Sequence, residues 1–252
     1  MEKNLKHIAI IGGGIMGISS ALYLIRRGCK VTIIEKEPNG EPASYGNASW
    51  LSSSSITPVL MPGAIFKIPK MLFSRDGPLF LNFPGVLRIL PWLLKYLSYS
   101  SEVKVNYISD HLAPLLSNSF EEHKKLAEGT DALKWIVNSP FLFIYKNRED
   151  YIKETLTWNI RKKHGFKPIE IGKDELSALV PGLSEEYTFA IKINNQGYIS
   201  NSKKYLNDLI EGFKKLGGKI IEDEVVDISS DQKTIIIKGK KEEMFSDSVV
   251  IA

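Results

Sequence analysis

The sequence predicts an α/β fold built on a parallel sheet, and three observations in the first 35 residues support this. Residues 7–11 form a short apolar run rich in β-branched side chains, as expected of a buried parallel strand. Three glycines, 12–14, follow directly, and a helix is expected over 15–27. A second apolar run, 31–34, then ends at Glu35. Strand, tight turn, helix and strand in this order indicate a βαβ unit.

The turn between the first strand and the helix has the glycine spacing of a dinucleotide cradle. Gly12 permits the sharp turn, Gly14 lets the backbone approach a pyrophosphate, and Gly17 lets the helix pack closely on the strand. The first N–H groups of the helix and the positive end of its dipole would face the phosphates. Glu35 stands where a carboxylate accepts hydrogen bonds from ribose hydroxyls and repels a 2′-phosphate. The unit therefore predicts an adenine dinucleotide, and FAD and NAD share this half.

The predicted cofactor residues of this unit belong to the turn, the first turn of the helix and the end of the second strand. A glycine-rich turn that binds nothing is the alternative. It is disfavoured because strand, turn, helix and terminal acid all occur in register. The residues are Ile11, Gly12, Gly13, Gly14, Ile15, Met16, Gly17, Glu35 and Lys36.

The composition is that of an ordinary globular chain. Of 252 residues, 43% are hydrophobic and 25% charged, which suits a sizeable core in one or two domains. The net charge of +4 includes no basic block interleaved with aromatics, so nucleic-acid binding is not expected. A single cysteine, Cys29, excludes an internal disulfide and a thiol metal cluster. The first six residues are too short and polar for a secretory signal, so a cytoplasmic location is expected.

Residues 38–63 predict a long functional loop. The segment is rich in Gly, Ser, Asn and Pro and has neither a helical nor a strand period. The glycine cradle followed by Ser44, Asn47–Ala48 and Pro62–Gly63 resembles the D-amino-acid oxidase family of flavoproteins. Within that family the pattern is most similar to the small-subunit type of bacterial D-amino acid dehydrogenase.

The resemblance implies that FAD is the cofactor and that this loop runs along it toward the flavin ring. Ser44, Asn47 and Ala48 would then lie near the pyrophosphate or the isoalloxazine. The family pattern usually continues with glycine after Asn-Ala, whereas this chain has Ser49 and Trp50. The backbone beside the flavin is therefore expected to differ locally from the family pattern.

The pattern after the loop predicts an inserted α+β domain over residues 58–195, which the resemblance makes the substrate domain. Residues 1–57 and 196–252 would form a discontinuous, Rossmann-like FAD-binding domain. By resemblance, the backbone of Val226 would bond the adenine edge. The expected elements after the loop include strands at 141–145, 189–193, 219–222 and 248–252, a meander over 228–244, and helices at 112–127, 148–164, 174–180 and from 200 to a stop at 217–218.

A further helix in the segment 66–100 has one apolar face. It lacks the roughly 20 uninterrupted apolar residues that cross a bilayer. Either the apolar face packs on its own domain, or the helix lies in a membrane interface with Trp92 and Tyr96 at headgroup level. The second arrangement would suit electron delivery to a membrane quinone. The residues of the face are Val86, Ile89, Leu90, Leu93 and Leu97, with Arg88 and Lys95 off it.

The chemistry implied by the resemblance is oxidative deamination of a D-amino acid. A hydride passes from the substrate Cα to flavin N5, and hydrolysis of the imino acid gives a 2-oxo acid and ammonia. Because the cofactor carries the hard step, the protein mainly supplies orientation, above all an arginine for the substrate carboxylate. No catalytic residue and no metal ligand is assigned from the sequence. The histidines are interpreted as a strand-edge residue, His7, and as surface or core residues, His111, His123 and His164.

The resemblance covers the N-terminal portion of a family member, so the sequence predicts a chain truncated at its C-terminus. Three alternatives stay open: a glycine- or sarcosine-type oxidase, a catalytically silent FAD-binding fragment completed by a separate polypeptide, and an NAD-dependent dehydrogenase. The expected partners are an amino-acid substrate and an electron acceptor, for which a membrane quinone is one candidate. Peripheral contact with the inner face of the plasma membrane would accompany a quinone acceptor.

Overall fold

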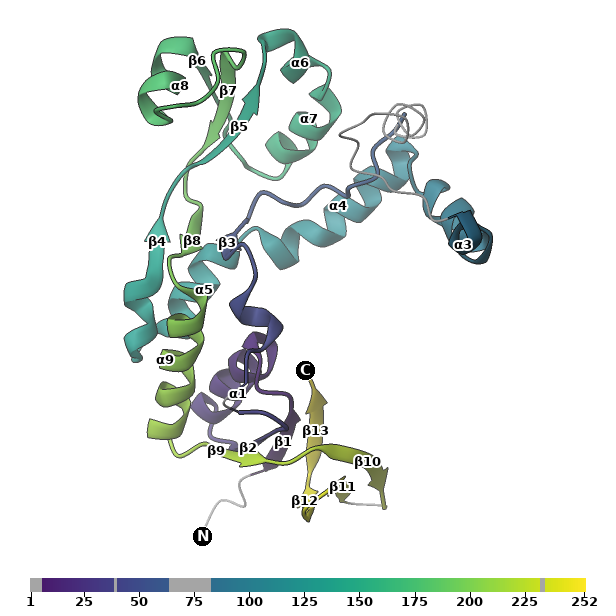
Figure 1. Cartoon of the computed structure of the whole chain (residues 1–252), viewed down its shortest axis with the longest axis vertical. Coiled ribbons are helices and arrows are strands. Elements are labelled where there is room, and N and C mark those ends of the chain that lie inside the picture. The colour runs from purple at the N-terminus through teal and green to yellow at the C-terminus, as the bar shows by residue number, and fades with distance from the viewer. Residues whose placement is uncertain (1–5, 39, 64–82, 232–233) are drawn as a thin grey trace. The chain divides into compact units, whose positions relative to one another are not determined.

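The computed structural model describes residues 6–38, 40–63, 83–231 and 234–252 (Figure 1). The chain divides into two compact units. Unit 1 consists of Met1–Leu51, Phe120–Asn138 and Gly197–Ala252, and unit 2 of Ser52–Ser119 and Ser139–Gln196. The sequence predicted domain boundaries at 57/58 and 195/196, whereas the structure has them at 51/52 and 196/197. The prediction also counted residues 120–138 as part of the inserted domain, although they belong to unit 1. The roles of the two domains stay a prediction.

Unit 1 is built on a four-stranded parallel sheet in the order β13-β1-β2-β9. Ile10 is paired with Ile33 of β2 on one side and with Val250 of β13 on the other. The predicted βαβ unit and the predicted strands at 219–222 and 248–252 are confirmed, and the structure places both of these later strands in the same sheet. The βαβ unit consists of β1 (His7–Ile11), α1 (Ile15–Arg26) and β2 (Lys30–Glu35), and the other two strands of the sheet are β9 (Lys219–Glu222) and β13 (Ser248–Ile251).

Helices α1 and α9 (Ser202–Lys215) pack together and form a core with one face of this sheet. Burial of one large apolar side chain in this core contributes about 1.5–3 kcal/mol to stability, relative to leaving it exposed. Helix α9 starts two residues after the predicted Ser200, because the Asn201 side chain caps it by accepting from Lys204 N at 2.9 Å. Gly217, at φ +89°, ends it as predicted. The core includes Ile10, Ile18, Leu22, Ile33, Leu206, Leu209 and Phe213.

The opposite face of the parallel sheet is covered by the predicted meander. Its strands pair antiparallel in the order β10-β11-β12, and Ile237 packs against Ala9 and Ile34. Coverage on both faces explains why the parallel strands read as continuous apolar runs. The meander consists of β10 (Val225–Ser230), β11 (Ile235–Gly239) and β12 (Glu243–Ser246).

A second, antiparallel sheet of unit 1 has the order β3-β8-β4. No sequence pattern indicated β4. The helix predicted over 112–127 is two helices, α4 (Glu102–Leu116) and α5 (Ser119–Ala127), separated by residues 117–118. Glu121 and Glu122 favour a new helix start, because they lie in the first turn of α5, at the positive end of its dipole. The elements are η1 (Ala43–Tyr45), β3 (Trp50–Leu51), α5 (Ser119–Ala127), η2 (Asp131–Trp135), β4 (Ile136–Asn138) and β8 (Gly197–Ile199).

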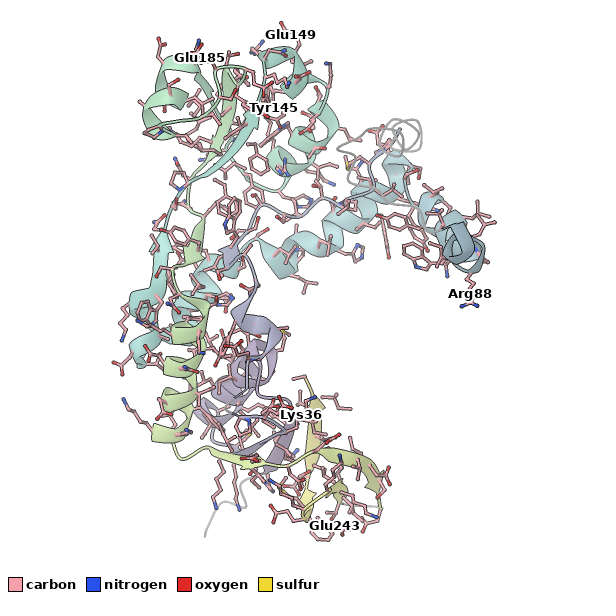
Figure 2. All side chains as sticks on the ribbon, viewed as in Figure 1. Lys36, Arg88, Tyr145, Glu149, Glu185 and Glu243 are labelled. Atoms are coloured by element: carbon pink, nitrogen blue, oxygen red, sulfur yellow. The ribbon has the colours of Figure 1, made fainter. Side chains whose placement is uncertain are left out.

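Unit 2 contains an antiparallel sheet in the order β5-β7-β6. The strands predicted at 141–145 and 189–193 are confirmed, and the helix predicted over 148–164 is broken at residues 153–154. Aromatic side chains around the buried Trp158, including Tyr145 (labelled in Figure 2), form its core with β7. The elements are α3 (Phe83–Leu97), α4 (Glu102–Leu116), β5 (Phe141–Tyr145), α6 (Arg148–Ile152), α7 (Thr155–Lys163), β6 (Ile169–Gly172), α8 (Lys173–Leu179) and β7 (Phe189–Ile193).

Helix α3 confirms the predicted helix in the segment 66–100. Ile89 and Leu90 of its apolar face are exposed, Leu93 and Leu97 are half-buried, and the side chain of Val86 lies outside the described residues. The exposed rings of Trp92 and Tyr96 stack with centroids 5.1 Å apart. None of the helices in the described parts of the chain combines the length and the apolarity needed to cross a bilayer.

Candidate functional site

Two glycines of the cradle are required by the backbone geometry of the turn. Gly12 has φ +105°, and a Cβ there would lie 2.4 Å from the carbonyl oxygen of Ala252. A Cβ on Gly17 would lie 1.9 Å from the carbonyl oxygen of Gly12, because α1 passes directly over the turn. A side chain at either position would displace the strand-to-helix connection. The spacing thus sets where the N-terminus of α1 lies.

The N–H groups of the turn point to side-chain acceptors. Gly13 N donates to Oε2 of Glu35 at 2.6 Å, and Glu37 N donates to Oε1 of the same carboxylate at 3.0 Å. Ile15 N, in the first turn of α1, donates to Oγ of Ser44 at 3.1 Å. The structure thus brings together four of the predicted cofactor residues, Gly13, Ile15, Glu35 and Ser44. Backbone donors gathered at a helix N-terminus suit an anion or another oxygen acceptor.

A cavity of about 510 Å³ opens beside Glu35, which we call the ribose-side cavity. Its volume lies in the range of small-molecule sites. Its lining combines acidic and basic side chains with apolar side chains of α9 and β9. It is lined by Gly13, Ile33, Glu35, Lys36, Glu37, Pro38, Gly40, Glu41, Pro42, Tyr45, Leu206, Ile210, Lys214, Ile220 and Glu222. Lys36 is labelled in Figure 2.

A second cavity of about 370 Å³, the loop-side cavity, lies between α1, α5, α9 and the segment 44–51. Three residues that the sequence placed along the cofactor, Ser44, Asn47 and Ala48, line it together. Among the described residues, its lining contains no lysine, arginine or carboxylate, and His123 is its one side chain that can carry a positive charge. The lining residues are Ile15, Ser44, Asn47, Ala48, Ser49, Trp50, Leu51, His123, Ile199, Ser202, Tyr205 and Leu206.

The departure at Ser49 from the expected glycine coincides with an unusual backbone conformation. Ser49 has φ +56°, a left-handed value that glycine adopts without steric cost. The Asn47 side chain supports it by accepting from Ser49 N at 2.8 Å, while its amide donates to the carbonyl of Ser44 at 3.1 Å. Asn47 therefore shapes this loop through its own hydrogen bonds.

His123 and Tyr205 are site residues that sequence analysis missed. His123 Nδ1 and the Tyr205 hydroxyl lie 2.9 Å apart, and both side chains line the loop-side cavity. Burial lowers the pKa of His123, and it raises the pKa of Tyr205. They come from α5 and α9, 82 residues apart, so no local pattern could pair them.

The family follows from comparison with known proteins. The sequence profile of the DAO family, described as FAD dependent oxidoreductase, matches residues 7–252. The chain belongs to this family. A D-amino-acid oxidase from Bradyrhizobium diazoefficiens is 33% identical over 251 residues, covering 98% of this chain and 59% of that protein. A D-amino acid dehydrogenase from Helicobacter pylori is 25% identical over 256 residues, with the same two coverages. The chain thus spans 59% of the length of both relatives.

The fold agrees with this family. The crystal structure of a glycine oxidase from Geobacillus kaustophilus superposes with a TM-score of 0.62 at 20% identity, covering 98% of this chain and 55% of the other. The α/β fold class and the resemblance to FAD-dependent oxidoreductases of the DAO family are confirmed. FAD is the cofactor of the family, and this confirms the choice of FAD over NAD.

The turn of this DAO-family chain fits an adenine dinucleotide. The Gly12 and Gly17 positions exclude side chains, whereas a Cβ on Gly14 would meet only Ser44 Oγ, at 3.4 Å, which is an ordinary contact. The side of the turn at Gly14 is thus open for a phosphate group to approach. Glu35 and Ser44 add a carboxylate and a hydroxyl at its two ends.

Three predicted cofactor residues, besides the glycines that shape the turn, lie outside the linings of both cavities. Ile11 belongs to β1, Met16 is 69% exposed on α1, and Val226 is 53% exposed. Val226 is the extra residue where the pairing of β10 with β11 shifts register. These assignments, and that of Gly17 as a cofactor contact, stay predictions.

The other histidines have structural partners. His7 bridges strands through Phe245 O and Thr32 Oγ1, each at 3.0 Å, which agrees with its interpretation as a strand residue. His164 Nε2 lies 2.9 Å from Asp110 Oδ1, a partner that the sequence did not reveal. No group of three or more potential metal ligands occurs among the described residues.

Proposed function

We propose that unit 1 binds FAD and that the protein oxidises a D-amino acid. The observation that carries the proposal is the turn itself, where Gly13 N and Ile15 N point to the oxygens of Glu35 and Ser44. Membership of the DAO family and the names of the two relatives support the choice of cofactor and substrate class.

In this proposal the residues of the cradle divide the cofactor between them. Glu35 and Lys36 hold the adenosine ribose, and the N–H groups of the turn and of the first residues of α1 hold the pyrophosphate. Ser44, Asn47 and Ala48 lie toward the flavin, and the Val226 backbone meets the adenine. The Ser44 hydroxyl, which accepts from Ile15 N, also carries a proton that it can donate to a phosphate oxygen.

The bound flavin would supply hydride acceptance from the substrate Cα. The chain would supply orientation, and unit 2 would be the substrate domain. Oxidation of a D-amino acid would give an imino acid, and water would convert it to a 2-oxo acid and ammonia.

We also propose that helix α3 touches a membrane surface when the acceptor is a quinone at the inner face of the plasma membrane. Its exposed Trp92 and Tyr96 have the amphipathic character of interfacial residues, and Lys95 and Arg88 add positive charge. The Arg88 side chain points away from the helix in Figure 2. Sedimentation with anionic vesicles tests this: a Trp92→Ser, Tyr96→Ser variant should stay in the supernatant while the unmodified protein pellets.

Anaerobic bleaching of bound flavin tests the proposed reaction. Purified protein is loaded with FAD, freed of excess by gel filtration, and mixed with D-alanine or L-alanine. Loss of the oxidised flavin spectrum with D-alanine and none with L-alanine is the expected result. Bleaching by glycine or sarcosine instead would replace the proposal with the oxidase alternative. A retained spectrum that no amino acid bleaches would support the catalytically silent alternative.

A further inference from the structure

The loop-side cavity contains a hydrogen-bonded pair that the proposed cofactor contacts do not use. His123 projects from α5 and Tyr205 from α9, and the two rings are tilted with centroids 5.9 Å apart. Tyr205 is almost fully buried, and its hydroxyl lies 2.9 Å from Nδ1 of His123. The contact fixes one nitrogen of the imidazole and the orientation of its ring.

The second nitrogen of that ring is left for the cavity. Among the described residues, no hydrogen bond or ion pair involves His123 Nε2, and the side chain lines the cavity. Because burial lowers the pKa of His123, the ring is neutral near pH 7. It therefore offers one neutral donor or acceptor, depending on which nitrogen carries the proton.

The polar groups of the cavity favour a neutral, hydroxyl-bearing ligand. Serine hydroxyls, the Asn47 amide, the Tyr205 hydroxyl and the His123 ring supply donors and acceptors, and the lining includes no lysine, arginine or carboxylate. A phosphate would need a cation or a row of N–H groups. A polyol, in contrast, matches scattered neutral partners.

The position of the cavity, next to the turn, bears on which polyol it could receive. It begins at Ile15, the first residue of α1, and includes Ser44, whose hydroxyl already meets the N–H of Ile15. It shares Leu206 with the ribose-side cavity. A dinucleotide that crosses the turn from Glu35 would therefore extend beyond its pyrophosphate toward this cavity.

We propose that the loop-side cavity receives the ribityl chain of FAD and that His123, positioned by Tyr205, hydrogen-bonds one of its hydroxyls. The inference rests on the proposed binding of FAD and adds to it a contact from α5. His123 is the binding residue in this scheme and Tyr205 the positioning residue, since the tyrosine acts by holding Nδ1.

Comparison of FAD with ADP tests the inference, because ADP lacks the ribityl chain. Isothermal titration is performed with the whole chain and with His123→Phe, which removes both ring nitrogens. FAD affinity should fall about tenfold, the effect of one hydrogen bond lost inside a site, while ADP affinity stays unchanged. His123→Gln, which keeps a donor and an acceptor, should recover part of the loss, and Tyr205→Phe should give a smaller loss than His123→Phe.

His111→Phe is the matched control, because that histidine is exposed on α4 and bonds the carbonyl of Tyr107, in its own helix. It should change neither affinity. Equal loss of FAD and ADP in His123→Phe would mean a general disturbance and would overturn the inference. Unchanged FAD affinity in that variant would overturn it while leaving FAD binding intact. Failure of the unmodified chain to bind FAD would instead overturn the proposed function.

Discussion

The carboxylate of Glu35 receives the N–H of Gly13 at 2.6 Å, across the turn that joins β1 to α1. A second N–H, from Glu37, reaches the other oxygen of the same carboxylate. The acid at the end of β2 is therefore held against the glycine turn by the backbone before any ligand is considered. The residue that would bind a ribose and the turn that would bind a pyrophosphate are thereby held next to each other.

Gly17→Ala should destabilise the chain by about 1–3 kcal/mol, the usual effect of overpacking. The new methyl group would lie 1.9 Å from the carbonyl oxygen of Gly12, so α1 must shift away from the turn. Gly46→Ala is the control, since a Cβ there would meet nothing within 4 Å and its φ is −98°. Thermal unfolding compares the two variants. Equal melting temperatures would show that α1 does not need this close approach.

Asp223→Ala should destabilise the meander. The buried carboxylate accepts from the N–H groups of Glu224, Lys241 and Glu242 at 2.8–3.2 Å, and these donors would lose their partner. Asp227→Ala is the control, because that carboxylate is exposed and accepts only from the adjacent N–H of Ile228 among the hydrogen bonds of the described residues. Chemical denaturation should show a lower midpoint for Asp223→Ala alone.

The same carboxylate makes a pH prediction. Burial by itself would raise the pKa of the Asp223 carboxyl, but the backbone N–H donors hold this pKa below its ordinary value of 3.8. A depressed pKa stabilises the folded state above the unfolded value, and this contribution is lost as the pH falls through the folded pKa. The stability difference between the unmodified chain and Asp223→Asn should therefore shrink below about pH 4. A difference that is constant from pH 7 to pH 3 would contradict the assignment.

His123 should also make stability depend on pH, but nearer to neutral pH than Asp223 does. Its pKa is lowered by burial from the ordinary 6.5, so the unfolded chain binds its proton first. Stability is full above about pH 7 and falls as the pH drops through 6.5, because protonation favours the unfolded state. Relative to His123→Gln, the unmodified chain should lose stability as the pH falls from about 7.5 to about 5.5, a range that brackets the ordinary histidine pKa of about 6.5. Parallel profiles for the two proteins would contradict this account.

Arg161→Met should leave stability unchanged or raise it. The guanidinium is buried, stacks 4.5 Å from the Phe143 ring and 4.6 Å from the Trp158 ring, and donates to the carbonyl of Ser54 at 3.2 Å. Its Nη1 has no hydrogen-bond partner among the described residues. Methionine keeps the packing without the buried charge.

Arg161→Ala is the comparison for this prediction. It removes the packing as well as the charge, and it should cost about 2 kcal/mol or more. Thermal unfolding of both variants decides whether the charge or the packing matters. Equal losses in the two would show that the guanidinium itself is required.

The parallel-sheet half of unit 1 could be predicted because its signals are local. Apolar runs, the glycines at 12, 14 and 17, and Glu35 each report on a geometry set within a few residues, and the structure places them as expected. The break between α4 and α5 and the short strand β4 were missed. Three-residue strands carry no period, and a helix break that still leaves apolar residues in register resembles a continuous helix.

In the candidate site, too, some residues could be predicted from the sequence and others could not. The family resemblance placed Ser44 among the cofactor residues, but it did not predict the contact of Ser44 with Ile15, which joins segments 29 residues apart. The His123–Tyr205 pair joins two helices through the packing of unit 1, and no spacing rule encodes it. Val226 was placed by resemblance, and its position at a β-bulge follows from the pairing of β10 with β11. Long-range pairs of this kind require the fold.

The affinity of this chain for FAD, measured with Glu35→Gln beside it, tests the central claim most directly. The unmodified chain should bind FAD stoichiometrically and remain yellow after gel filtration. Glu35→Gln keeps the shape of the side chain but removes its negative charge. Because that charge strengthens the hydrogen bonds accepted from the ribose hydroxyls and the backbone N–H groups, the variant should bind FAD about tenfold more weakly or worse. Glu121→Gln, an exposed helix residue paired with Lys124, should bind like the unmodified chain. FAD binding that is absent, or equal in all three proteins, would contradict the cradle as the cofactor site.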